Sequence, residues 1–249
     1  MHLRHVSAPE NKRIGKMHVI VITHRFIYAE CLYKAYYCAR HAMAGIRVDI
    51  VASESPFDQF YSGNIIYKGI NLSPRSPKDS IAAGIAHITE DRQKLGLMLS
   101  KSILENMTLV GLSDKIKGFF INIKKHSPLI KNIVESLRIK TPSVFQEAGN
   151  LSGGNQQKVV LGKWLFAEAD TYIFDEPTRG IDVNAKAEFY KIMSDLTKKG
   201  KSIIMISSDM PELISMSDRI LVVRKGRINS EIQKENITEE NIIRSALGI

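Results

Sequence analysis

Long hydrophobic runs and cysteine are what this 249-residue sequence most clearly lacks. No apolar stretch approaches the roughly 18 residues of a membrane-spanning helix, and no apolar core follows the first residues as in a signal peptide. The two cysteines, Cys31 and Cys38, have a spacing that is not a metal-binding signature. These absences predict a chain of a reducing compartment, without a membrane span, a secretory leader or a disulfide framework.

An excess of positive charge is present but is not concentrated. The formal net charge of +9 would suit a nucleic acid or an anionic membrane surface. However, the basic residues are spread along the chain, and the densest groups, at 115–125 and 198–201, are interpreted as solvated helix ends. Because no basic or aromatic stripe is present, nucleic acid is not an expected partner.

The N-terminal quarter has weak patterns, and the rest has clear ones. Residues 18–24 form a β-branched run that predicts a buried strand, whereas a helix over 28–44 and a strand over 45–51 are weaker expectations. Ser76-Pro77-Lys78-Asp79 predicts the start of a helix, and residues 102–138 are expected to be mostly helical.

Strands and helices alternate in the C-terminal part. We expect strands over 85–88, 171–174 and 202–206, helices over 154–166, 184–198 and 211–216, a hairpin over 219–228, and a final helix from about 238. This alternation predicts an α/β fold whose mainly parallel sheet is covered by helices on both faces.

Two carboxylates, Asp175 and Glu176, directly follow one of the predicted buried strands. Open α/β sheets bind ligands beyond the carboxyl ends of their strands. A carboxylate in that place can hold Mg²⁺, and its neighbour can orient or deprotonate a water molecule. Taken alone, an Asp-Glu pair is more simply explained as two solvated acids at a strand end.

A serine and two glycines, Ser152, Gly153 and Gly154, begin the predicted helix at 154–166. The serine hydroxyl and the glycine amides can face an anion without obstruction, and the helix dipole favours negative charge there. Taken alone, these residues are more simply explained as a serine-capped turn.

Together the two stretches indicate a particular protein family far more specifically than either stretch does alone. Residues 151–156 resemble the signature motif of ABC transporter ATP-binding subunits, residues 171–176 resemble their Walker B strand, and residues 180–182 resemble their D-loop. Over residues 62–249 the resemblance is finer, to the second nucleotide-binding half of sugar importers of the ribose, galactose and xylose type. The stretches that carry it are 73–77, 89–92, 151–158 and 207–212.

The resemblance implies a P-loop-NTPase-like fold over residues 62–249, with a helical signature subdomain at about 100–150, after a degenerate or atypical segment over 1–61. It implies ATP and Mg²⁺ as cofactors, ATP hydrolysis coupled to carbohydrate import, and a peripheral place on the cytoplasmic face of the cell membrane. Implied partners are membrane permease subunits, a second nucleotide-binding domain in a homo- or heterodimer and, indirectly, a periplasmic sugar-binding protein.

The same resemblance implies roles for individual residues. Asp175 would help to hold Mg²⁺, and Glu176 would be the catalytic base. Nucleotide-binding roles fall on Ser152, Gly153, Gly154, Asn155, Asp182 and Glu90, the first three of them toward a nucleotide held by the partner domain. Ser208 stands where the family usually has a switch histidine, and Glu90 where it usually has glutamine. Because serine has no imidazole, slow hydrolysis is expected.

The P-loop is the main departure from the family. No G-x-x-x-x-G-K-[ST] motif occurs in the sequence. The family's spacing leads to residues 41–48, where Arg47 fits but His41, Ile46 and Val48 do not, since their side chains obstruct phosphate or lack a hydroxyl for Mg²⁺. This segment is a vestige or a coincidence. We predict that the chain alone binds MgATP weakly or not at all.

Three hypotheses remain open at this point. The first is a truncated or impaired ATP-binding subunit of a sugar importer. The second is a non-hydrolysing partner module that donates its signature motif in trans. The third, prompted by the charge, is an ABC-type ATPase that acts on nucleic acid. Residues 19–25 resemble the last strand and switch histidine of a first nucleotide-binding half, or are a chance strand. The former would fit an internally deleted or frame-disrupted descendant of a two-half subunit.

Overall fold

The computed structural model describes residues 17–22, 65–111, 122–224 and 227–249. Its strands are β1 (Met17–Ile22), β2 (Ile65–Tyr67), β3 (Ile70–Leu72), β4 (Ile85–Ile88), β5 (Thr171–Asp175), β6 (Ser202–Ser207), β7 (Arg219–Arg224) and β8 (Arg227–Gln233). Its α-helices are α2 (Pro77–Ala82), α3 (Ile103–Thr108), α5 (Ser127–Ser136), α6 (Gly153–Phe166), α7 (Val183–Lys198), α8 (Met210–Met216) and α9 (Glu239–Leu247). The shorter turns of helix are the π-helix η1 (Arg92–Gly96) and the 3₁₀ segments η2 (Ile123–His126), η3 (Ala148–Asn150) and η4 (Lys234–Asn236).

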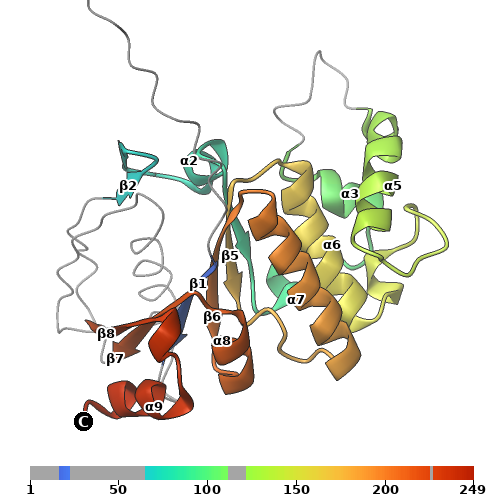
Figure 1. Cartoon of the computed structure of the whole chain (residues 1–249). Helices are drawn as coiled ribbons and strands as arrows, with labels where there is room; N and C mark the ends of the chain where they lie inside the picture. The colour runs from blue at the N-terminus through green and yellow to red at the C-terminus, as the bar shows by residue number, and fades with distance from the viewer. Residues whose placement is uncertain (1–16, 23–64, 112–121, 225–226) are drawn as a thin grey trace, which may run out of the picture.

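A six-stranded sheet forms the centre of the molecule, in the order β4-β5-β6-β1-β7-β8. All neighbouring pairs are parallel except β7 and β8, which pair antiparallel as the predicted hairpin. The predicted α/β fold with a mainly parallel sheet is therefore confirmed. Helices α6 and α7 lie against one side of the sheet, on β4 and β6 respectively, with α3 and α5 packed on α6, and the small β2-β3 sheet lies apart from these helices (Figure 1).

Side chains of β5 alternate between two hydrophobic layers, one on each face of the sheet. Tyr172 and Phe174 belong to the large core that includes α6 and α7, whereas Ile173 belongs to a smaller cluster with Tyr67 of β2. A strand that is buried on both faces needs apolar residues at every position, because successive side chains point in opposite directions. This explains why residues 171–174 form a largely apolar run in the sequence.

Capping residues set the starts of the helices near the sheet edge. The Asp182 carboxylate accepts a hydrogen bond from the Ala185 amide at 2.9 Å and begins α7. Ser76 and Asp79 begin α2 as predicted, with the Ser76 amide donating to the Asp79 carboxylate at 2.8 Å. Such caps satisfy backbone groups that have no partner inside the helix. The predicted helix starts therefore agree with the structure to within a residue or two.

The strand predicted near the N-terminus is confirmed as β1, and it lies in the middle of the sheet. Val19 pairs with Met205 of β6 on one side and with Ile220 of β7 on the other. The division of the chain at residue 62 stays a prediction, although β1 joins the same sheet as the later strands. The expected elements at 28–44 and 45–51, and the P-loop equivalent at 41–48, lie outside the described residues.

Parallel pairing brings the carboxyl ends of five strands to one edge of the sheet. Strands β4, β5, β6, β1 and β7 all end there, so the segments that follow them meet at this edge. Glu90 follows β4, Glu176 directly follows Asp175 at the end of β5, and Ser208 directly follows Ser207 at the end of β6. In the part of the chain that the structure describes, no helix combines the length and the apolar character needed to cross a membrane.

Candidate functional site

Asp175 is the last residue of β5 and carries an unsatisfied buried oxygen. The residue is 9% exposed, and its Oδ1 atom has no hydrogen-bond partner among the described residues. Burial, together with the neighbouring Glu176, raises the pKa of Asp175 to about 6. A buried carboxylate oxygen without a donor fits a divalent cation, because Mg²⁺ prefers carboxylate oxygens supplemented by phosphate and water.

Glu176 stands next to it in a strained backbone conformation. Its φ is +44°, a left-handed value that is costly for a residue with a side chain, and such outliers gather at functional sites. Its amide donates to the Ile206 carbonyl at 2.9 Å, which fastens the end of β5 to β6. Burial raises the pKa of Glu176, whereas hydrogen bonds from the hydroxyl and amide of Ser208 lower it. The structure thus brings Glu176 and Ser208 together.

Helix α8, which follows β6, contains a buried acid that the sequence pattern does not single out. Glu212 is 1% exposed, and the Ser207 hydroxyl lies 2.5 Å from its Oε2 atom. Burial raises the pKa of Glu212, and its charge in turn raises the pKa of Glu176. In the sequence Glu212 resembles an ordinary first-turn acid of α8, since it lies three residues after the cap Asp209. No local signal distinguishes it from a solvated one.

The start of α6 forms the second part of the site. Ser152 is the exposed N-cap, and its Oγ accepts a hydrogen bond from the Asn155 side-chain amide at 3.1 Å. The other side-chain group of Asn155, its Oδ1, accepts from the Lys140 amide at 3.1 Å. A Cβ added to Gly154 would lie 3.0 Å from the Ala185 Cβ of α7. The structure therefore gives Asn155 and Gly154 roles inside the chain, and leaves Ser152 open to solvent.

Glu90 and Asp182 flank these two parts. Glu90 makes an ion pair with Arg179, which lies in the turn after β5, and Asp182 is exposed at the start of α7. A Cβ on Gly153 would lie 3.5 Å from the Gly180 carbonyl, so the start of α6 lies against the same turn. All of the predicted site residues therefore lie on the loops of one sheet edge or at the start of α6. Their roles remain predictions.

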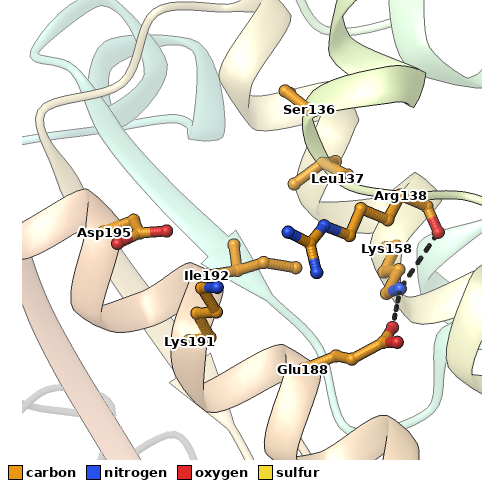
Figure 2. A pocket seen from close by; sticks show the side chains of 8 residues that line it. All are labelled: Ser136, Leu137, Arg138, Lys158, Glu188, Lys191, Ile192 and Asp195. Atoms are coloured by element: carbon orange, nitrogen blue, oxygen red, sulfur yellow. Dashed lines mark hydrogen bonds and ion pairs between the residues drawn. The ribbon is translucent and has the colours of Figure 1, made fainter.

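A hollow lies between the end of α5, the middle of α6 and α7, and it is lined by an ion pair between a buried lysine and an exposed glutamate (Figure 2). Lys158, with a side chain 4% exposed, donates to the Glu188 carboxylate at 2.6 Å and to the Arg138 carbonyl at 3.2 Å. Lys158 holds the pKa of Glu188 below its usual range. This pair joins α6 to α7 and serves packing, so the carboxyl edge of the sheet remains the candidate site. No group of three or more potential metal ligands occurs among the described residues.

A change of Asp175 to asparagine is expected to stabilise the metal-free protein at neutral pH. The folded pKa is about 6, above the unfolded value of about 3.9, so the folded state binds the proton more tightly. The free energy of unfolding must therefore fall as the pH rises from about 4 to about 6, by no more than about 3 kcal/mol. Asp175→Asn removes this loss.

Urea unfolding in a chelating buffer, from about pH 4 to about pH 8, would measure the difference between the two proteins. Asp175→Asn should gain on the wild type as the pH rises and then hold a constant advantage. Asp218→Asn is the control, because Asp218 is exposed, whereas Asp175 is buried. Parallel stability curves for Asp175→Asn and the wild type would contradict a raised pKa of the buried Asp175 carboxyl group.

Comparison with known proteins supports the family resemblance that the sequence motifs indicate. Residues 50–179 match the family described as ABC transporter. The chain is similar to a putative ribose/galactose/methyl galactoside import ATP-binding protein of Agrobacterium fabrum, with 42% identity over 207 residues, which are 83% of this chain and 41% of that protein. It is also similar to the galactose/methyl galactoside import ATP-binding protein MglA of Clostridium tetani, with 46% identity over 201 residues, 80% of this chain and 40% of that protein. The chain thus spans about two-fifths of the length of these relatives.

Solved structures show the same fold at lower sequence identity. CbiO1 of Clostridium perfringens, part of an ABC transporter complex, has a TM-score of 0.65 at 18% identity, covering 92% of this chain and 81% of that one. The ADP conformation of MJ1267, an ATP-binding cassette, has a TM-score of 0.65 at 16% identity, covering 95% and 89%. At this level of identity the likeness concerns the arrangement of helices and strands alone.

Proposed function

Because the chain belongs to the family of ABC transporter ATP-binding domains, we propose that it is the ATP-binding part of a sugar importer and couples ATP hydrolysis to carbohydrate uptake. Its relatives are named for the import of ribose and galactose, which supports a sugar as the transported solute. One observation carries the proposal. Asp175, with an unsatisfied buried oxygen, and Glu176, with a strained backbone, stand side by side at the carboxyl end of β5.

The residues at this edge divide the chemistry between them. Mg²⁺ bound with ATP would neutralise phosphate charge, and Asp175 is the residue that would hold it. Glu176 would accept a proton from the attacking water, and Ser208 would keep its carboxylate in place through hydrogen bonds. Since Ser208 has no imidazole that could form a hydrogen bond to the γ-phosphate, we expect ATP turnover to be slow.

The start of α6 serves a second nucleotide. Ser152, Gly153 and Gly154 would bind the γ-phosphate of a nucleotide held by a second nucleotide-binding domain, with Glu90 and Asp182 on the neighbouring loops. This arrangement requires a partner domain, either a second copy or a related chain. The assembled pair would sit on the cytoplasmic face of the membrane against permease subunits, and a sugar-binding protein would contact only the permease.

The sequence favours a second candidate function as well. No P-loop motif occurs in it, and His41, Ile46 and Val48 are unsuited to phosphate at the equivalent positions. The chain would then be a non-hydrolysing module that donates its signature motif to a partner's nucleotide. In that case the chain alone binds MgATP weakly, and calorimetric titration that gave micromolar affinity would exclude this candidate.

Donation in trans has a direct test. Mixing the chain with a sugar-importer domain that has an intact P-loop but no working signature motif should raise the ATPase rate of that domain. Ser152→Ala should lower the gain by about 10- to 100-fold, because a hydrogen bond to a charged phosphate is lost. Ser136→Ala, on the exposed end of α5, is the matched control. An equal gain with Ser152→Ala would remove the signature motif from the proposal.

A further inference from the structure

The loop that follows β4 lies along one face of helix α6. Gln93 of η1 donates to the Gln156 side-chain carbonyl at 3.2 Å, and Lys163 donates to the Gly96 carbonyl at 2.8 Å. Lys163 is 8% exposed and is therefore committed to this contact. The contacts on α6 fall at residues 153, 156, 160 and 163, a spacing that keeps them on one side of a helix. Loop and helix form a continuous packed unit.

Arg92 connects this unit to a third segment. Its Nη1 donates to the Arg179 carbonyl, in the turn after β5, at 3.3 Å. Its guanidinium also lies directly on Gly153, because a Cβ built there would be 2.5 Å from Nη2 and 3.3 Å from Cζ. The side chain of Arg179 returns to Glu90 through an ion pair. The Arg92 side chain thus extends from η1 to contact both the start of α6 and the turn that follows Glu176.

Local electrostatics does not account for this position. Cations are unfavourable near the N-terminus of a helix, where the backbone dipole is already positive. Arg92 nevertheless covers the first residue of α6, and its buried Nε atom has no partner among the described residues. Stabilisation of α6 therefore does not explain the contact, whereas its geometry, which joins two segments, does.

We propose that Arg92 is a positioning residue that holds the start of α6 and the turn after β5 in one fixed geometry. Residues 152–154, which face the partner's nucleotide, and Glu176, which faces the nucleotide of its own domain, are then presented together. The Arg179 amide donates to the Glu176 carbonyl at 3.1 Å, so that Arg92 acts on Glu176 through this turn. The consequence for ATP turnover rests on the proposed function, whereas the contact itself does not.

A lysine cannot replace Arg92 in this role. The guanidinium is a rigid planar fork with several donors, so one group can bond a carbonyl while its face covers a glycine. Lysine offers a single point charge on a flexible stem and can reach only one of the two segments. Arg92→Lys therefore separates the positioning role from the mere presence of positive charge.

Amide hydrogen exchange on the full chain tests the proposal. The Gln156, Arg179 and Ile181 amides report on the two segments, since they donate to the carbonyls of Ser152, Glu176 and Thr178. In Arg92→Ala and Arg92→Lys these amides should exchange about tenfold faster, the loss expected for a hydrogen bond from a charged donor. Amides of β5 should keep their rates.

Lys94→Ala is the control, because Lys94 is exposed on the same π-helix and forms a local ion pair with Asp91. Faster exchange at both segments in the Arg92 variants, with Lys94→Ala unchanged, supports the proposal. Unchanged rates in the Arg92 variants would overturn it. Equal acceleration in β5 would also overturn it, because the effect would then be general destabilisation.

A second readout separates this proposal from the proposed function. In the mixed ATPase assay, Arg92→Lys should lower kcat about tenfold and leave KM for MgATP unchanged, since positioning acts on the step after binding. Absence of stimulation by the wild-type chain would refute donation in trans while the exchange result still decides the role of Arg92. Full stimulation by Arg92→Lys would refute the positioning role alone.

Discussion

Replacing Glu176 with glutamine is expected to lower ATP turnover of the assembled transporter by about 10²- to 10⁴-fold. Glutamine has the same size and can keep a hydrogen bond to Ser208, but it has no carboxylate to accept a proton. The strained backbone at φ +44° is a property of the position, so the substitution leaves the turn in place. Nucleotide should remain bound in the variant, because binding does not depend on the proton transfer.

The measurement is steady-state ATPase activity together with the amount of nucleotide retained after gel filtration. Glu235→Gln is the control, because Glu235 is exposed in η4 on another part of the chain. A normal rate for Glu176→Gln, combined with a dependence on Ser152, would remove the catalytic role of this site. It would leave the chain as a donor of the signature motif.

Replacing Phe174 with alanine is expected to lower the free energy of unfolding by about 3–5 kcal/mol. Phe174 is fully buried in β5, where its ring meets Phe189 of α7 edge-on at a centroid distance of 5.7 Å. It also stacks with Tyr172 at 6.3 Å. The substitution opens a cavity between the sheet and α7. The total free energy of unfolding of a folded domain is only about 5–15 kcal/mol. A large fraction of the protein should therefore unfold under mild denaturant.

Urea titration followed by circular dichroism would measure this loss. Phe145→Ala is the matched control, since Phe145 is 53% exposed and its removal should change stability by no more than about 0.5 kcal/mol. Equal losses for the two variants would mean that the contact between β5 and α7 does not hold the core together.

Much of the site was predictable because its signals are local. The run before Asp175 is mostly apolar, as a doubly covered strand requires, and Ser152 followed by two glycines is a pattern typical of a helix start. The positions of Glu90 and Ser208 at the ends of strands followed from the same alternation. Their shared edge follows once the strands are parallel, because parallel strands all end on one side.

Other features have no local signal. Glu212 looks like a helix-capping acid in the sequence, and only the packing of α8 against β6 buries it. Arg92 looks like one cation in a charged loop, and only the path of η1 along α6 places it on Gly153. Such contacts join residues that lie tens of positions apart, so periodicity and capping do not report them.

The sequence by itself determined the helices and strands of the C-terminal part, the two carboxylates and the signature motif, since each depends on residues that are close together in the chain. It also showed that no P-loop motif is present. Only the tertiary structure decided that β1 stands between β6 and β7, and that Arg92 links the signature helix to the turn after β5. The physical reason is that strand order and side-chain packing depend on contacts between distant segments, which form only when the sheet is assembled.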